Sequence, residues 1–329
     1  MRPWFFFGLS LALAGCGPST QARQGAPDGG DTEDLAPVAG DLAAPRDLSG
    51  GVPRYRYVID KVYMPTMRTA AAFDLNGDGS ADNQLGALAA TLAARSPALG
   101  TAVQSAETQA IALDGDALEL ISLGTSDPQL AGDPRAEVGL YVAVSHDLPD
   151  LTGLGQFTIA PNTLRPSLPG GLSGGTFASV DPARAASPPS ASLCIALLAK
   201  TRVTLTLHGA RITFAAAKNG LMTGQLNGAL TLDDLQKVLI PVLALNLTAL
   251  ENQPNCDAAC AAVKANFDIN PADKTVTAFE VATYLDVPLK PDVEVFDAKG
   301  NWAPSLANRN PNGWSLGLTF TAKPATFTE

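Results

Sequence analysis

Histidine, cysteine and basic residues are scarce in this chain of 329 residues. There are 2 His and 4 Cys, and 22 Lys and Arg stand against 32 Asp and Glu, which gives a formal net charge of -10. Two histidines leave few bases for nucleophilic catalysis and few ligands for zinc. The acidic balance argues against a nucleic-acid partner. No convincing catalytic constellation is present, so we predict that the protein is not an enzyme.

Long apolar runs are missing as well. The apolar run near the N-terminus, 4–14, is too short to cross about 30 Å of hydrocarbon. It follows Arg2 and ends in small residues, which is the pattern of a signal peptide. The residues Leu13, Ala14, Gly15 and Cys16 resemble the bacterial lipobox, and this resemblance implies that the signal is removed and that Cys16 carries a lipid anchor. The alternative is an ordinary secretory signal that is cut nearby.

Large apolar residues are almost absent from the segment that follows Cys16. Its Ala, Gly, Pro, Asp and Ser cannot bury enough apolar surface to offset the entropy of ordering the chain, which indicates a flexible acidic tether. We therefore divide the chain into a signal peptide (1–15), a lipidated tether (16–53) and a single large globular domain (54–329), which could be bipartite. The expected location is the bacterial cell envelope, exported and lipid-anchored in the outer membrane.

The cysteines fit an exported protein. If Cys16 is lipidated, Cys194, Cys256 and Cys260 remain in an oxidising compartment, where disulfides persist. Cys256 and Cys260 are one helical turn apart and could form a bridge, and pairing of Cys194 with either of them is the alternative. A zinc half-site at this spacing lacks further Cys or His ligands nearby.

Alternation of apolar and polar residues dominates the globular domain. Apolar residues fall on even positions in 138–144 and on odd positions in 203–207, and the apolar parity flips across Gly209 in 203–214, which predicts a bulge or a turn there. Many short strands separated by Gly and Pro favour an α+β fold that is mostly β, with an antiparallel β-sandwich-like body, a few helices and EF-hand-like loops. Helices are expected at 83–96, at 231–253 and at about 256–266, the second one opened by a capping box of Thr231 and Asp234.

The stretch Phe73–Gly86, "FDLNGDGSADNQLG", concentrates oxygen-bearing side chains around two glycines. Counted from its first aspartate, ligands fall at positions 1, 3, 5, 7 and 9 with a glycine at position 6, which is the spacing of an EF-hand-type calcium loop. The loop resembles thrombospondin type 3 and dockerin loops. The expected metal ligands are Asp74, Asn76, Asp78, the Ser80 carbonyl and Asp82. The alternative is an exposed Asn-Gly-Asp-Gly turn.

A second stretch, "FDINPADKTVTAFEV", resembles an irregular EF-hand that is one residue longer than the standard loop and has lost its glycine. Ala272 is interpreted as the insertion. The expected ligands are Asp268, Asn270, Asp273, Thr275 and Glu280. The alternative is a helix-loop-helix that kept its fold and lost its ion.

Most of the chain beyond the tether resembles a family of uncharacterised, Asp/Gly-rich bacterial lipoproteins. The resemblance rests on the lipobox, on both loops and on "LHGARITF", "GLMTGQLNGAL" and "PDVEVFDAKGN". It implies an extracytoplasmic location and Ca2+ as cofactor. The expected partners are the membrane, through the lipid anchor, and an envelope protein or a glycan, in a structural or ligand-binding role. The alternatives are an adhesin for glycan or protein, and a surface hydrolase that uses Ser173 of "GLSGG" or an unrecognised site.

Overall fold

The computed structural model describes residues 53–114, 118–144, 148–161, 163–185, 187–198, 202–218 and 222–329. The predicted signal peptide, the lipidation site Cys16 and the tether up to residue 52 lie outside the described residues. The signal peptide, the lipidation of Cys16 and the tether therefore stay predictions.

The strands of these described ranges form a single antiparallel sheet of 10 strands. Its order is β3-β5-β4-β2-β1-β10-β9-β8-β6, with β7 paired to β8 beside this path. β5 also pairs with β6, so the strand order closes on itself. The strands are β1 (Arg54–Tyr63), β2 (Glu119–Gly124), β3 (Gly132–Asp133), β4 (Glu137–Val142), β5 (Ser167–Ser173), β6 (Thr176–Ser179), β7 (Ala191–Ala196), β8 (Arg202–Ala215), β9 (Met222–Thr231) and β10 (Gly313–Pro324).

The mixed, mostly antiparallel β fold is confirmed, but the expectation of a sandwich-like body is not met by this topology. A sandwich needs two sheets packed face to face, whereas here β1 pairs with β2 on one side and with β10 on the other, in the middle of one continuous sheet. Alternation along a strand tells which side chains are buried, and it does not tell which strands are neighbours.

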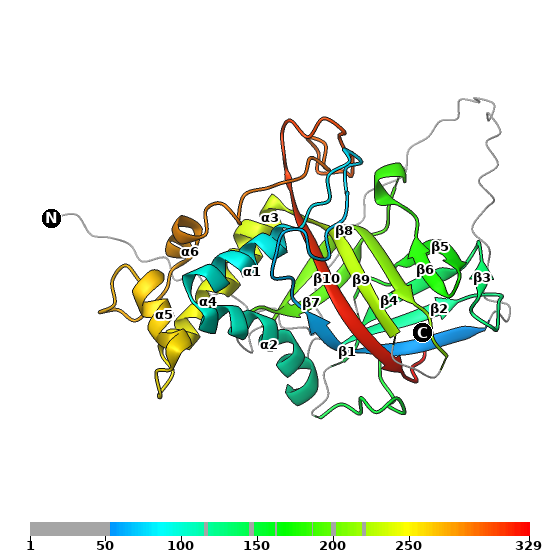
Figure 1. Cartoon of the computed structure of the whole chain (residues 1–329), viewed down its shortest axis with the longest axis horizontal. Coiled ribbons are helices and arrows are strands. Elements are labelled where there is room, and N and C mark those ends of the chain that lie inside the picture. The colour runs from blue at the N-terminus through cyan, green and yellow to red at the C-terminus, as the bar shows by residue number, and fades with distance from the viewer. Residues whose placement is uncertain are drawn as a thin grey trace, which may run out of the picture.

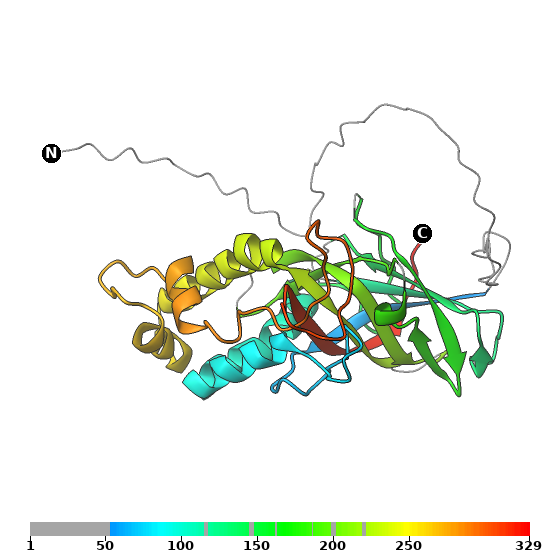
Figure 2. The ribbon, with the colours of Figure 1, turned by 90° about the horizontal axis from the view of Figure 1, so that it is seen from above.

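The helices α1 to α6 gather at one end of the molecule, beside the sheet (Figures 1 and 2). They are α1 (Gln84–Arg95), α2 (Pro97–Asp114), α3 (Leu232–Asp234), which continues through a π-helical segment (Leu235–Leu239) into α4 (Ile240–Glu251), α5 (Ala258–Asn266) and α6 (Ala278–Tyr284). A short 3-10 helix (Pro182–Arg184) lies apart from them, against β8. None of the helices in the described ranges is both long enough and apolar enough to cross a bilayer.

Two local features follow directly from the sequence. The side chain of Thr231 accepts a hydrogen bond from Asp234 N, and Asp234 accepts one from Thr231 N, so the predicted capping box is present. The pairing of β8 with β9 shifts register between His208 and Arg211, and Gly209 between them has a φ of 58°. The bulge predicted from the apolar parity is therefore confirmed.

A separate small core joins two loops far apart in sequence. Leu75 is buried in a cluster with Val293, Val295 and Phe296, and Trp302 packs against this cluster. The segment 293–297 carries apolar residues at 293 and 295 as a strand would, but it makes only isolated bridges, from Val293 and Phe296. These contacts hold the loop that contains Leu75 against the 292–302 segment at the top of Figure 1.

Candidate metal centre

The acidic loop between Phe73 and Asp82 is closed at its base by those two residues. Phe73 N donates to Asp82 O at 3.2 Å, and Asp82 N donates to Phe73 O at 3.0 Å. Within the loop, Gly77 and Gly79 have φ values of 81° and 90°, a region that L side chains rarely adopt. The two glycines therefore set the shape of the loop.

The carboxylate of Asp74 lies at the centre of this turn. It accepts hydrogen bonds from three successive backbone N–H groups, those of residues 77–79, at 2.6, 3.1 and 2.9 Å. Asn76 Nδ2 donates to Asp78 Oδ2 at 3.2 Å, and Ser80 N donates to Asp78 Oδ1 at 2.7 Å. The structure thus brings Asp74, Asn76 and Asp78 together, while Ser80 is exposed at the edge of the loop.

Asp82 has a carboxylate oxygen without a hydrogen-bond partner. The residue is only 6% exposed, and the unpartnered atom is its buried Oδ2. Oδ1 lies 3.5 Å from Nη2 of the half-exposed Arg68. Burial, together with the charges of Asp292, Asp78 and Asp74, raises the pKa of Asp82 to about 7, while Arg68 opposes the rise. The single positive charge of Arg68 thus faces several carboxylates, and it cannot balance all of their negative charge.

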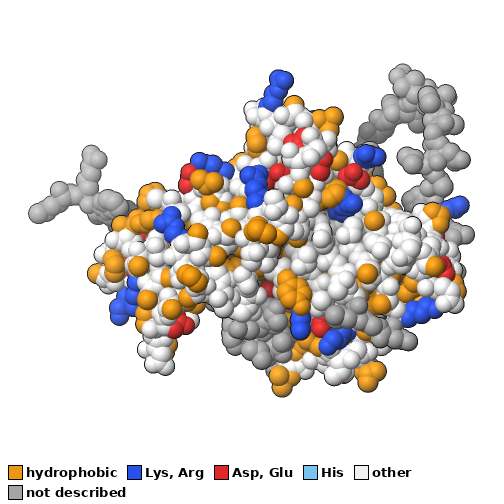
Figure 3. Space-filling model, in the orientation of Figure 1, with side chains coloured by type: hydrophobic (Ala, Val, Ile, Leu, Met, Phe, Trp, Pro, Cys, Tyr) orange, Lys and Arg blue, Asp and Glu red, His pale blue; other side chains and the backbone are white. Residues whose placement is uncertain are grey.

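Asp292 also belongs to this group, although it is not one of the predicted ligands. It is buried, its Oδ1 accepts from Ser315 N at 2.8 Å, and its Oδ2 accepts from Ser315 Oγ at 2.5 Å. Arg68 Nη2 also lies 3.5 Å from Asp292 Oδ2, across a separation of 224 residues. No local spacing rule connects positions so far apart. On the face seen in Figure 3, acidic and basic side chains gather around the loops at the top of the molecule.

The second predicted loop connects α5 to α6. Asp268 Oδ1 accepts from Asn270 N at 2.8 Å, Asn270 Nδ2 donates to Asp273 Oδ2 at 2.9 Å, and Thr275 N donates to Asp273 Oδ1 at 3.1 Å. Lys274 has a φ of 54°. This is the left-handed conformation that a standard loop gives to its glycine, directly after the fifth-position ligand that we assign to Asp273.

Glu280, a predicted ligand of this loop, forms a helix cap. Its Oε2 accepts from Thr277 N at 2.6 Å and from Thr277 Oγ1 at 2.8 Å, which forms a capping box at the start of α6. Its Oε1 accepts from Ile269 N at 2.7 Å. Burial raises the pKa of Glu280, but these hydrogen bonds from Thr277 and Ile269 outweigh it and lower the pKa overall. Both carboxylate oxygens are thus already engaged.

The carboxylate of Glu251, at the end of α4, lies beside Asp268 instead. Burial and the neighbouring carboxyl group of Asp268 together raise the pKa of Glu251 to about 7. Asp273 acts in the same direction, and Lys264 opposes it. Glu251 was not among the predicted ligands because it precedes the loop and belongs to no loop motif.

The predicted disulfide between Cys256 and Cys260 is present, with a Cα–Cα distance of 5.1 Å. Cys194 is buried in β7 and takes no part in this bridge. The alternative pairing of Cys194 with either cysteine is therefore wrong.

Ser173 does not lie on the turn from strand to helix that the G-x-S-x-G pattern of a hydrolase requires. Ser173 ends β5 at a tight hairpin to β6, where Gly174 and Gly175 have φ values of 55° and 78°, so the required turn from strand to helix is absent at this site. His208 lies on β8 with Nδ1 3.3 Å from Ser190 Oγ, and its ring packs edge-on against Phe296. His146 lies outside the described residues.

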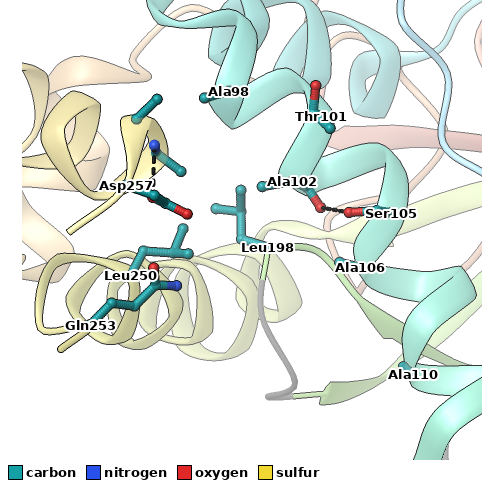
Figure 4. Close-up of a pocket in the computed structure, with 12 residues that line it drawn as sticks. Ala98, Thr101, Ala102, Ser105, Ala106, Ala110, Leu198, Leu250, Gln253 and Asp257 are labelled. Carbon is teal, nitrogen blue, oxygen red and sulfur yellow. Dashed lines mark hydrogen bonds between the residues drawn. The ribbon is translucent and has the colours of Figure 1, made fainter. Parts of the chain in front are cut away.

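The groove shown in Figure 4 has one carboxylate among its described lining residues. It has a volume of about 620 Å³ between α2, α4 and α5, and small side chains such as Ala102 and Ser105 line it. Its only acidic side chain among the lining residues, Asp257, accepts hydrogen bonds from Ala259 N and Cys260 N as the N-cap of α5. Asp257 therefore has a structural role.

Within the described ranges, no three His, Cys, Asp or Glu side chains converge as they would around a bound metal ion. Calcium also takes amide, carbonyl and water oxygens, six to eight in all. In the first loop the Asp82 Oδ2 atom is buried and free of other bonds, so the residues present fit a calcium ion. Binding there requires some of the local hydrogen bonds of Asn76 and Asp78 to be exchanged for bonds to the ion.

Comparison with known proteins gives no match for this chain, whether to a family model, to a curated sequence or to a solved structure.

Proposed function

We propose that the protein is an exported, lipid-anchored component of the bacterial cell envelope that binds calcium at its Phe73–Asp82 loop, with a structural or ligand-binding role. The observation that carries the proposal is the buried, unpartnered Oδ2 of Asp82, among the carboxylates of Asp74, Asp78 and Asp292. A cation placed there neutralises a repulsive group and joins the loop to the 292 segment. Binding to the folded state alone stabilises the fold.

The lipobox at Cys16 and the acidic tether support an envelope location. The disulfide between Cys256 and Cys260 agrees with it, because disulfides persist mainly outside the cytoplasm. Calcium is abundant there, so a weak site, with a Kd of about 10⁻⁴ to 10⁻³ M, is sufficient.

Calcium is expected to stabilise the full chain in detergent. With 10 mM CaCl2 in place of EDTA, a site of this affinity adds about 1.4 to 2.7 kcal/mol to the free energy of unfolding. This corresponds to a rise of about 3 to 10 °C in Tm, measured by differential scanning calorimetry. The double variant Asp74→Ala, Asp78→Ala is expected to lose the part of the shift that comes from this loop.

A matched control removes the same charge elsewhere. Asp233 and Asp286 are exposed and make (i, i+4) ion pairs with Lys237 and Lys290. The double variant Asp233→Ala, Asp286→Ala should keep the full calcium response. Equal Tm values in calcium and in EDTA for the unmodified chain contradict the proposal.

A ligand-binding role is favoured by one surface of the sheet. A shallow hollow of about 490 Å³ is lined by uncharged side chains, including a cross-strand row from β8 to β1. The row consists of Thr213, Gln225, Thr319 and Tyr63. Hydroxyl and amide groups beside an exposed aromatic ring suit a neutral glycan, because such a ligand offers both hydroxyl groups and apolar C–H faces.

Tyr63→Ala is expected to reduce retardation of the protein in affinity electrophoresis through gels that contain neutral polysaccharide. The ring of Tyr63 is 48% exposed and supplies the apolar contact. Phe279→Ala removes an aromatic ring that is 72% exposed on α6 and serves as the control. If no polysaccharide retards the unmodified chain, or if both variants behave alike, the glycan role is wrong.

A further inference from the structure

Glu251 is the most strongly buried carboxylate without a partner near either loop. The residue is only 2% exposed, and neither Oε1 nor Oε2 has a hydrogen-bond partner. A buried carboxylate that is neither paired nor hydrogen-bonded is costly, so a fold that keeps one usually provides a proton or a cation for it.

The face of α4 that carries Glu251 lies against the Asp268–Glu280 loop. Thr248 Oγ1 accepts from Val276 N at 2.9 Å and lies 3.2 Å from Val276 O. Asn252 Nδ2 donates to Lys274 O at 2.8 Å. Residues 248, 251 and 252 share one side of a helix, so these two contacts place Glu251 over the interior of the loop.

The loop presents a matching unpartnered atom. Asp268 is 8% exposed, and its Oδ2 is buried without a hydrogen-bond partner. Two buried carboxylates with three unpartnered oxygens between them therefore face each other, and Asp273 lies near enough to repel Glu251. Glu280 cannot serve here in the same way, because both of its oxygens cap α6 and its loop.

We propose that the carboxylates of Glu251 and Asp268 bind a second calcium ion, and that Glu251 of α4 supplies the acidic ligand that the loop motif assigns to Glu280. Carboxylate oxygens, completed by amide, carbonyl and water oxygens, suit a hard divalent cation such as Ca2+. The site goes beyond the Phe73–Asp82 loop and does not depend on it. The disulfide helps to position the new ligand, because Cys260 Sγ lies 3.3 Å from Glu251 O.

The test uses the full chain in detergent with Asp74→Ala and Asp78→Ala, so that the first loop cannot contribute. The probe is CaCl2, and the readouts are titration calorimetry and the dependence of Tm on calcium concentration. One site is expected, with a Kd of about 10⁻⁴ to 10⁻³ M. Adding Glu251→Gln is expected to weaken binding by about tenfold or more, because the charge of the ligand set is reduced.

Glu280→Gln is the matched comparison. Glutamine can still serve in a capping box, so α6 keeps its cap, and we expect the Kd to change by less than about threefold. If the opposite is found, with binding lost in Glu280→Gln and kept in Glu251→Gln, Glu280 is the ligand and the proposal is wrong. If calcium does not bind and Glu251→Gln stabilises the protein, Glu251 and Asp268 share only a proton, and the proposal is equally wrong.

The number of bound ions gives a second measurement should the Asp74 and Asp78 changes impair folding. In flow dialysis of the otherwise unmodified chain, Glu251→Gln should remove one bound calcium per chain, and Glu280→Gln should remove none. An unchanged number in Glu251→Gln overturns the proposal. If the Phe73–Asp82 loop does not bind calcium, the unmodified chain binds one ion fewer, but Glu251→Gln still removes one ion and Glu280→Gln still removes none.

Discussion

Replacing Asn83 with alanine is expected to destabilise the protein by about 3 to 5 kcal/mol. Asn83 is fully buried and caps α1, where its Oδ1 accepts from Gly86 N at 3.2 Å and from Gly317 N of β10 at 3.1 Å. Its Nδ2 donates to Ala70 O at 2.7 Å and to Gly317 O at 2.9 Å. Alanine leaves these backbone groups without partners inside the protein, where each lost bond costs about 1 to 3 kcal/mol.

Urea unfolding at pH 7 measures this loss. Asn266→Ala is the control, since Asn266 Nδ2 donates only within its own helix, to Ala262 O at 2.8 Å. We expect that variant to lose less than about 1 kcal/mol. A loss below about 1 kcal/mol for Asn83→Ala would show that water replaces the missing bonds, and that Asn83 does not join α1 to β10 as described.

The second large effect concerns the free edge of β7. This strand pairs with β8 on one side, and on its other side Cys194 N donates to Glu119 Oε1 at 2.9 Å, while Ala196 N donates to Glu107 Oε2. Both glutamates are almost completely buried. They satisfy backbone donors that no neighbouring strand reaches.

Burial raises the pKa of Glu107 to about 8, although the hydrogen bond from Ala196 and the charge of Arg202 lower it. Burial also raises the pKa of Glu119 well above its ordinary value, and the charge of Glu107 adds to this. The folded state therefore holds protons that the unfolded state releases above pH 4.5 or so. Stability must then fall as the pH rises from about 4.5 towards about 8.

Glu107→Gln is expected to flatten this pH dependence. Each pKa unit is worth about 1.4 kcal/mol, so ionisation of Glu107 costs the unmodified protein up to about 5 kcal/mol by pH 8 to 9. Glutamine keeps an acceptor for Ala196 N and has no charge to bury. The free energy of unfolding, measured by urea at several pH values from 5 to 9, should fall less steeply in the variant.

Glu294→Gln is the control for this series. The hydrogen bond from Asn310 N lowers the pKa of Glu294, with a further bond from Arg309 N, so its contribution changes only at acid pH. The free energy of unfolding of Glu294→Gln should change with pH between 5 and 9 as steeply as that of the unmodified protein. Parallel slopes in Glu107→Gln and the unmodified protein would mean that Glu107 is already ionised in the fold.

Local features of this fold could be predicted from sequence because their causes are local. The capping box of Thr231 and Asp234, the bulge at Gly209 and the disulfide between Cys256 and Cys260 each depend on residues a few positions apart. The turn chemistry of the first loop follows from its glycines in the same way.

Features that depend on the meeting of distant segments could not be predicted. Asp292 joins the first acidic group across more than two hundred residues, and Glu251 reaches the second loop from a preceding helix. The sheet order has the same cause, because an alternating pattern suits a sandwich and a single sheet equally well. Glu280 is ambiguous for a local reason, since one glutamate at one spacing fits both a metal ligand and the helix cap that it forms here.

The position of β1 has a mechanical consequence for an anchored protein. β1 is the first strand of the described chain, and it lies between β2 and β10 with hydrogen bonds along both edges. A pull transmitted through the chain that precedes Arg54 acts along the axis of this strand, so many hydrogen bonds must break at the same time. An edge strand would instead open one pair at a time. The lipid anchor that we propose would therefore pull on a strand that is hydrogen-bonded along both edges.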